Sequence, residues 1–284
     1  MVRQPWDAAF EWMRRLNLMK TRPGKRHQRG HGISVVVPFR PDNDIRERTW
    51  EWLREYYTHH LPGIEIIMGT DDGFDPFSKS MAVNDGCRRA TGEVFVIMDA
   101  DCLIDPDVIV ECAQNIRDAE RRDHRRWYVP YRRFYRLSAE FSEELLESNP
   151  RRHVHLEDPP PSWELDVWTG TSSGHHWGAL ITIMPRRAFE LVRGMDPRFR
   201  SWGSEDVSFL WALDTLYCRH RTTDNPVYHL WHPRFGGDTH VTRFWKGGTA
   251  GQNNDLAMKY RAALHDPVRM GRLVDEGFSD DSPD

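Results

Sequence analysis

Two aspartates directly follow an apolar segment, in an arrangement that suits a divalent cation. The segment Val94-Phe95-Val96-Ile97-Met98 runs into Asp99-Ala100-Asp101. Carboxylates are hard oxygen ligands, and Mg²⁺ or Mn²⁺ is usually bound by a few carboxylates together with substrate phosphates. The same three residues also occur by chance in solvated turns. The motif by itself therefore leaves a metal site and a plain turn as alternatives.

A second acidic pair lies far downstream, in Trp202-Gly203-Ser204-Glu205-Asp206. A carboxylate within hydrogen-bonding distance of a hydroxyl group can take its proton as a general base. The structural alternative is the start of a helix, with Ser204 as the N-cap and both acidic residues in the first turn, where the helix dipole favours them. One geometry can serve both purposes, since a helix N-terminus can present Asp206 to a cleft.

Histidines gather at two places in the second half of the chain. His229 and His232 are three residues apart, and His175 and His176 are adjacent. Imidazole is a common metal ligand, and beside carboxylates it suits Mn²⁺ better than oxygen ligands alone would. A single histidine more often has a structural role. For His175 and His176, contact with a bound molecule and a place at the end of a strand are equally open.

The elements that must position these side chains alternate between strands and helices. This alternation indicates an α/β fold with a mostly parallel sheet covered on both faces. In such sheets ligands bind beyond the carboxyl ends of the strands. We therefore expect Pro38–Arg40, Asp71–Gly73 and Asp99–Asp101 at one rim. The expected strands are 33–38, 64–68 and 93–98, and the expected helices are 44–57, 80–90 and 106–117, with Ile45, Arg48, Trp52 and Tyr56 as contact residues of the first helix.

The motifs along the first half occur in a recognisable order. This order, over roughly residues 33–110, resembles the nucleotide-binding half of the inverting family-two glycosyltransferases. Two positions depart from the family pattern: Arg40 replaces a small or aromatic residue, and Phe74 replaces a serine. The residues that carry the resemblance are Val37-Pro38-Phe39-Arg40, Thr70-Asp71-Asp72-Gly73, Lys79 to Gly86, Ala90-Thr91-Gly92-Glu93 and Asp99-Ala100-Asp101.

The resemblance implies a GT-A type fold, with a Rossmann-like sheet, that binds a nucleotide-sugar. It implies that Asp72 contacts the base or ribose of the donor, that Asp99 contacts the ribose or a metal, and that Asp101 binds the metal. The full set of donor-binding residues expected on this basis is Pro38, Arg40, Asp72, Lys79, Asn84, Asp99 and Asp101.

A second resemblance covers residues 174–206, from Gly174-His175-His176-Trp177-Gly178 through Gly194-Met195-Asp196 to Trp202-Gly203-Ser204-Glu205-Asp206. This stretch is similar to the catalytic segment shared by β-galactosyltransferases and polypeptide N-acetylgalactosaminyltransferases. The resemblance implies that Asp206 is the general base and, because the retaining enzymes have asparagine there, that the reaction inverts. We expect Trp202, Glu205 and His176 to contact sugar. A histidine completes the metal site in these families, and we expect His232 first and His229 second.

The segment from Arg121 to Arg136 holds seven arginines among aromatic residues. Arginine with aromatics is typical of surfaces that contact phosphate and stack on bases. A strand around Trp127–Tyr131 with a solvated basic edge is the interpretation we favour. The primary hypothesis is transfer of a hexose from a nucleotide-sugar, UDP-sugar first, to a glycan, small molecule or protein. The alternatives are the same chemistry on a nucleic-acid base, and a catalytically silent nucleotide- or carbohydrate-binding module.

Composition places the chain among soluble globular proteins. Of its 284 residues, 39% are hydrophobic and 29% charged, and the net charge is −4. Such a balance favours no polyanionic partner. There is no run of about 20 apolar residues, no secretory signal at the start and no paired cysteine motif, so we expect a cytoplasmic protein without a membrane span. Its oligomeric state is left open.

The expected organisation has three parts. Residues 1–32 comprise a helix over 5–19 and a basic, fraying linker over 20–32. Residues 33–265 form the glycosyltransferase domain, with a nucleotide-binding half at 33–118 and an acceptor and catalytic half at 119–265. Residues 266–284 form an acidic tail.

Overall fold

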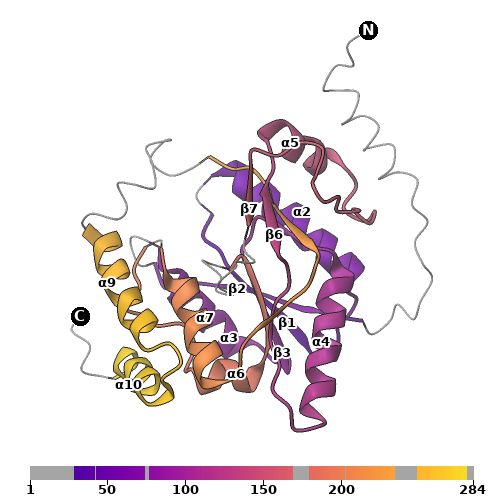
Figure 1. Ribbon diagram of the computed structural model, residues 1–284. Coiled ribbons are helices and arrows are strands. Elements are labelled where there is room, and N and C mark those ends of the chain that lie inside the picture. The colour runs from indigo at the N-terminus through magenta and orange to yellow at the C-terminus, as the bar shows by residue number, and fades with distance from the viewer. Residues whose placement is uncertain are drawn as a thin grey trace.

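The computed structural model describes residues 29–41, 43–73, 77–168, 179–201, 203–233 and 248–279, which form a mixed α/β fold with two sheets (Figure 1). The strands are β1 Ile33–Pro38, β2 Glu65–Gly69, β3 Val94–Met98, β4 Cys102–Leu103, β5 Tyr128–Val129, β6 Arg133–Arg136, β7 Leu165–Trp168, β8 Ile181–Pro185, β9 Arg221–Thr222 and β10 Pro226–His229. The helices are α2 Asp44–His60, α3 Lys79–Arg89, α4 Pro106–Glu120, α5 Ala139–Glu147, α6 Arg186–Leu191, α7 Glu205–Leu216, α9 Gly248–Ala262 and α10 Pro267–Gly277.

The larger sheet has the strand order β2-β1-β3-β8-β5-β9. β1 pairs in parallel with both β2 and β3, and β5 pairs in parallel with β9, whereas β8 runs antiparallel to its neighbours β3 and β5. The expected mostly parallel sheet is confirmed. Because β1, β2 and β3 point the same way, the residues that follow them meet at one edge.

The first strand forms because its sequence suits a position in the middle of a sheet. Ile33–Pro38 contains four β-branched residues, and all six of its residues are buried. α3 packs on β1 and β2, and α4 packs on β3 and β8. Contact with α3 is close at Gly69, where an added Cβ would overlap the carbonyl oxygen of Ala82. A glycine at that position therefore lets helix and sheet approach.

Helix α2 starts where the sequence indicates and runs three residues further than expected, to His60. The side chain of Asn43 caps it by accepting a hydrogen bond from the backbone N–H of Arg46 at 3.0 Å. Trp52 and Tyr56 are buried as expected, but Ile45 and Arg48 are exposed. The buried stripe is centred on Leu53 and begins only at Thr49, so the prediction was wrong for Ile45, whereas Arg48 does make a contact, an ion pair with Glu143 of α5 at 2.6 Å.

The arginine-rich segment differs most from its expectation. β5 lies between β8 and β9, so it is not an edge strand. Trp127, Tyr128 and Tyr131 are buried, and the indole N–H of Trp127 donates to the carbonyl oxygen of Cys218 at 2.6 Å. The expected strand is present and the flanking Arg125 and Arg132 are exposed, so only the edge position was wrong. These three aromatic rings are core residues and cannot stack on nucleic-acid bases.

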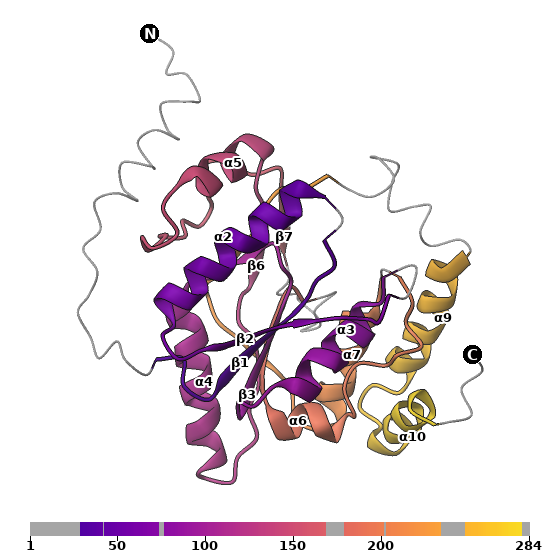
Figure 2. The same cartoon turned by 180° about the vertical axis from the view of Figure 1, so that it is seen from behind.

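Order also extends beyond the expected domain at both ends of the described chain. Gly30 donates its backbone N–H to Pro62 at 3.0 Å, so this end of the expected linker is held in place. Pro267–Gly277, which lies in the expected tail over 266–284, forms α10 instead, capped by Asp266 and with Met270, Leu273 and Val274 buried. α10 packs beside α7 and α9 (Figure 2).

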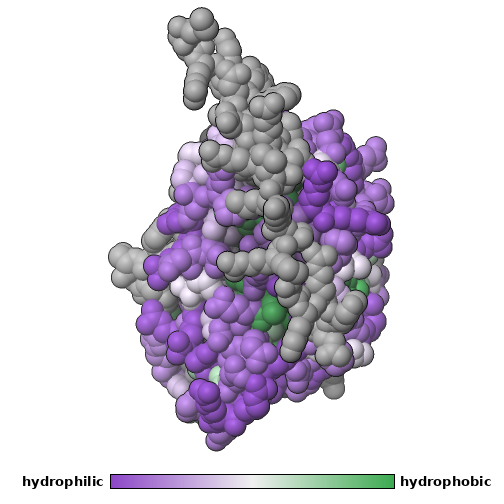
Figure 3. All heavy atoms as spheres, turned by 90° about the vertical axis from the view of Figure 1, so that its right-hand side faces the viewer, coloured by the Kyte–Doolittle hydropathy of each residue, from purple (hydrophilic) through white to green (hydrophobic). Residues whose placement is uncertain are grey.

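The surface agrees with the charged composition. On the face seen in Figure 3 hydrophilic residues predominate, and hydrophobic residues show only in small areas. Among the helices of the described ranges, none combines the length and the apolar character that crossing a bilayer requires.

A half-buried histidine at the end of α2 predicts acid sensitivity. Burial, helped by the charges of the neighbouring His153 and His59, lowers the pKa of His60 from 6.5 to about 4. Between these two pH values His60 is protonated in the unfolded chain but not in the folded chain. The free energy of unfolding therefore decreases as the pH falls from 6.5 towards 4. We expect His60→Gln, which can still donate to the carbonyl oxygen of Pro150, to remove part of this loss, on the order of 1 kcal/mol because solvent screens a ring that is only half buried.

Urea unfolding at pH 7 and pH 5 measures this effect. The exposed His124→Gln is the control and should leave the difference between the two pH values unchanged. If the wild type and His60→Gln lose the same stability between pH 7 and pH 5, His60 is not the source of the acid sensitivity.

Candidate functional site

The rim beyond β1 and β2 carries an ion pair between a buried carboxylate and a half-buried guanidinium. A guanidinium nitrogen of Arg40 lies 2.5 Å from Oδ1 of Asp71, and Oδ2 of Asp71 accepts the backbone N–H of Ser78 at 2.9 Å. Asp71 is buried, and the guanidinium of Arg40 lies over the ring of Phe77. Pro38, the last residue of β1, is buried beneath them. Arg40 thus occupies the rim as expected and is held there by a carboxylate.

Asp72, expected to contact the donor, behaves differently from Asp71. It sits in a turn with a φ of 54° and is exposed. The organising carboxylate of this loop is therefore Asp71, which the sequence interpretation did not select. The Asp71-Asp72 pair was a visible signal, but only the fold decides which member faces inward. Contact of Asp72 with a donor stays a prediction.

Lys79 meets the first aspartate of the DxD motif. Its ammonium nitrogen lies 2.6 Å from Oδ1 of Asp99, and both side chains are largely buried. Burial raises the pKa of Asp99 to about 6 against the opposing charge of Lys79, and the charges of Asp101 and Asp206 add to the rise. Burial disfavours the charge on Lys79, yet Asp99, Glu205 and Asp206 raise its pKa well above the usual range. Lys79 therefore pairs with Asp99 and also interacts electrostatically with Glu205 and Asp206.

The second aspartate of the motif lies between two histidines. β4 pairs antiparallel with β10, with Cys102 opposite His229, and the backbone N–H of Leu230 donates to the carbonyl oxygen of Asp101 at 2.8 Å. This pairing brings Nε2 of His229 to 3.6 Å and Nε2 of His232 to 3.3 Å from the Asp101 carboxylate. Donor atoms of all three residues lie within 4.8 Å of one another. One carboxylate and two imidazoles at this spacing fit a transition-metal ion such as Mn²⁺.

The electrostatics of these three groups are asymmetric. Although burial acts to raise it, the pKa of Asp101 lies well below its usual range because His229 and His232 face the carboxylate. Burial lowers the pKa of His229, which favours the neutral form that binds metals. The pKa of His232 is raised despite burial, because its ring bonds to Asp101. A metal cation bound by His232 would replace the proton that the raised pKa otherwise keeps on this ring.

The candidate base sits at the start of α7. Oδ2 of Asp206 accepts the backbone N–H of Ala179 at 3.0 Å, and Oδ1 accepts that of Val207 at 2.7 Å. Glu205 is buried and accepts the backbone N–H of Gly203 at 2.9 Å. Burial raises the pKa of Glu205 to about 7, and the charge of Asp206 contributes.

The first turn of α7 corrects the capping hypothesis. Ser204 holds the N-cap position, but its φ is 71° and its side chain makes no capping hydrogen bond. The carboxylates of Glu205 and Asp206 accept nearby backbone N–H groups instead. Because the charge of Asp206 raises the pKa of both Asp99 and Lys79, Asp206 and the DxD motif share one electrostatic environment.

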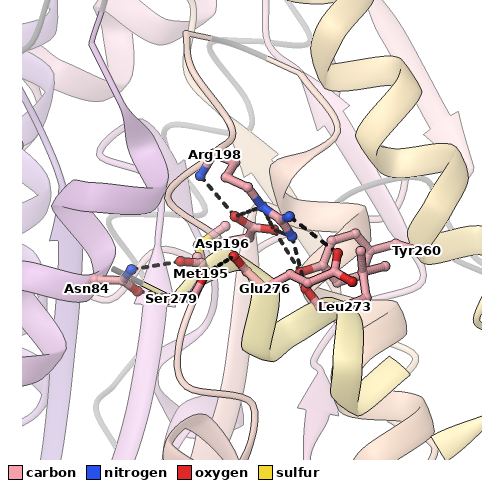
Figure 4. Close-up of polar contacts among 8 residues, drawn as sticks. All are labelled: Asn84, Met195, Asp196, Arg198, Tyr260, Leu273, Glu276 and Ser279. Atoms are coloured by element: carbon pink, nitrogen blue, oxygen red, sulfur yellow. Dashed lines mark hydrogen bonds and ion pairs between the residues drawn. The ribbon is translucent and has the colours of Figure 1, made fainter. Parts of the chain in front are cut away.

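Asn84, expected to contact the donor, binds another part of the chain. Its amide nitrogen donates to the carbonyl oxygen of Met195 at 2.7 Å, and its amide oxygen accepts the N–H of Met195 at 2.8 Å (Figure 4). The side chain joins α3 to the loop before α7, and contact of Asn84 with a donor stays a prediction. Trp202 and His176, expected to contact sugar, lie outside the described residues.

Part of the chain matches the model of a known protein family. The model of glycosyl transferase family 2 matches residues 41–152. The matched range includes Asp71, Lys79, Asp99 and Asp101, whereas Asp206, His229 and His232 lie outside it. No curated protein matches the chain significantly.

Solved structures of glycosyltransferases are similar to the chain at low identity. The catalytic domain of Drosophila beta1,4galactosyltransferase 7, solved with xylobiose, is 14% identical, with 79% of each chain covered and a TM-score of 0.41. The mannosyltransferase PcManGT from Pyrobaculum calidifontis, solved with GDP-Man and Mn²⁺, is 14% identical, covering 96% of this chain and 82% of its own, with a TM-score of 0.43. At this level of similarity these neighbours decide neither donor nor acceptor.

Proposed function

We propose, from the premise that this chain is a glycosyltransferase with a family-two segment at residues 41–152, that it moves a hexose from a nucleotide-sugar to a hydroxyl acceptor. UDP-sugars are the first donor class to test, and the transfer inverts the configuration at the anomeric carbon of the sugar. Mn²⁺ is the cation that one carboxylate and two imidazole ligands favour, with Mg²⁺ as the alternative.

One observation supports this proposal above the others. Asp101 follows a buried strand of the family-two segment and lies 3.3 Å and 3.6 Å from two imidazole nitrogens contributed by a different part of the chain. A structural turn requires no such convergence of buried ionisable groups, whereas sites that bind metals and perform chemistry are where perturbed groups cluster. His232 and His229 are both candidate ligands beside Asp101, with Asp99 adjacent.

The proposed division of labour follows from the charges. A bound cation would neutralise the donor diphosphate and so stabilise the departing nucleotide. Lys79, at the start of α3, offers a positive charge beside Asp99 for the same phosphates. Asp206, supported by two backbone N–H groups, accepts the proton of the attacking hydroxyl as the new glycosidic bond forms. Glu205, next to it, is placed to bind a sugar hydroxyl.

Thermal unfolding with a panel of donors tests the proposal. We expect UDP-sugar with Mn²⁺ to raise Tm by several degrees, since ligand at about 100 times its Kd adds roughly 2.7 kcal/mol. The same donor with a chelator should raise Tm much less. GDP- and dTDP-sugars serve as comparison donors, and free phosphate as the control. A panel in which no nucleotide-sugar stabilises the protein more with metal than without would contradict the proposal.

A further inference from the structure

The loop between α6 and α7 leads directly into the helix turn that carries the candidate base, and its local conformation is strained. Three of its residues that are not glycine, Arg193, Ser201 and Ser204, have a positive φ, at 59°, 59° and 71°. Non-glycine residues adopt this region only when their surroundings impose it. Since the side chain of Ser204 does not cap α7, contacts from elsewhere must hold the loop.

A buried carboxylate in this loop, Asp196, links an arginine of the loop to the C-terminal helices. Asp196 accepts the backbone N–H of Arg198 at 2.9 Å and its guanidinium at 2.7 and 3.0 Å. The hydroxyl of Tyr260, on α9, donates to Oδ2 of Asp196 at 2.9 Å (Figure 4). The same Arg198 donates to the carbonyl oxygen of Leu273 on α10 at 2.9 Å. Buried charge of this kind is costly to leave unpaired, so the cluster is held together as a unit.

The C-terminal helices are shaped to reach this carboxylate. An added Cβ on Gly277 of α10 would lie 2.9 Å from the carboxylate of Asp196, so only glycine permits this approach. On α9, Asn253 accepts the N–H of Arg200 at 3.2 Å and donates to its carbonyl oxygen at 2.7 Å. Both helices also pack on α7.

The opposite side of the loop is held by the helix that carries Lys79. Asn84 of α3 bonds to both backbone groups of Met195, and the hydroxyl of Ser78 donates to the carbonyl oxygen of Phe199 at 3.3 Å. The loop is thus held between α3, which lies inside the family-two segment, and α9 and α10, which lie outside it.

We propose that Asp196, paired with Arg198 and Tyr260, is a positioning residue through which α9 and α10 set the place of Asp206 relative to the donor-binding rim. This inference rests on the proposed function. A small displacement of a reacting group can reduce a rate about 100-fold without removing any group that touches substrate. The C-terminal helices therefore act on the transfer step through this loop, in addition to covering the core.

Tyr260→Phe tests the positioning role with the smallest change, because it removes one hydroxyl and keeps the ring. We expect kcat to fall about tenfold while KM for the nucleotide-sugar stays within about twofold. Asp196→Asn, which keeps the shape of the side chain, should lower kcat further. The matched control is Val274→Ala, which removes buried apolar contact from α10 without touching the carboxylate. It should lower Tm and leave kcat, measured well below Tm, unchanged.

Hydrogen exchange separates this inference from the proposed function. We expect both Tyr260→Phe and Asp196→Asn to speed exchange in residues 194–207, with residues 208–216 of α7 still protected, and Val274→Ala to leave 194–207 unchanged. A wild type without transferase activity refutes the proposed function, and the exchange result still decides whether Asp196 holds the loop. Wild-type exchange in both variants, or an equal loss of kcat in Val274→Ala, would overturn the inference.

Discussion

Asp206→Asn is expected to lower the rate of transfer by at least about 100-fold, the contribution typical of a general base, and to leave binding of the nucleotide-sugar nearly unchanged. Asparagine keeps the size of the side chain, and its amide oxygen can still accept one of the two backbone N–H groups that aspartate accepts, from Ala179 and Val207. The fold of α7 should therefore persist, and the loss reports the missing proton acceptor.

Steady-state kinetics with a donor and acceptor found in the binding panel measure this effect, with calorimetry for donor affinity. Asp118→Asn, at an exposed ion pair on α4, is the control and should transfer normally. Glu205→Gln provides the decisive comparison, because Glu205 is the neighbouring carboxylate with a pKa of about 7. Near-normal turnover in Asp206→Asn together with loss in Glu205→Gln would move the base to Glu205.

Asp101→Asn is expected to remove the metal dependence of donor binding. The carboxylate lies between two imidazoles, and asparagine would supply a neutral oxygen in place of the negative charge that a divalent cation requires. Loss of even an outer-shell partner typically weakens metal binding 10- to 100-fold, so we expect at least about a 100-fold loss of Mn²⁺ affinity here.

Calorimetric titration with Mn²⁺, followed by UDP, measures this effect without any need for an acceptor. Asp85→Asn is the matched control, since Asp85 lies on α3 and pairs at the surface with Arg88 and Arg89. His232→Gln and His229→Gln then rank the two candidate imidazoles. Equal UDP affinity with and without metal in the wild type would reject the metal role of Asp101.

The local sequence was sufficient to predict the strands and helices around the site. Apolar β-branched residues over 33–38 and the early proline at Pro106 predicted β1 and α4, because these signals depend on backbone preferences that act over a few residues. Parallel strands of that spacing then predicted one shared rim. The prediction of a tail over 266–284 was wrong for α10. The acidic residues at the end of the chain suggested a tail, but Met270, Leu273 and Val274 give this segment an apolar face that packs on the domain.

The sequence alone also determined which chemistry the chain could carry, because the identities of Asp99, Asp101 and Asp206 and the order of the motifs are properties of the residues themselves. Only the tertiary structure decided which groups meet. It joined His229 and His232 to Asp101 through the β4–β10 pairing, turned Asp71 inward and Asp72 outward, and engaged Asn84 with Met195. These outcomes depend on contacts between residues far apart in the chain, where burial and register select the partner, and no local pattern encodes that choice.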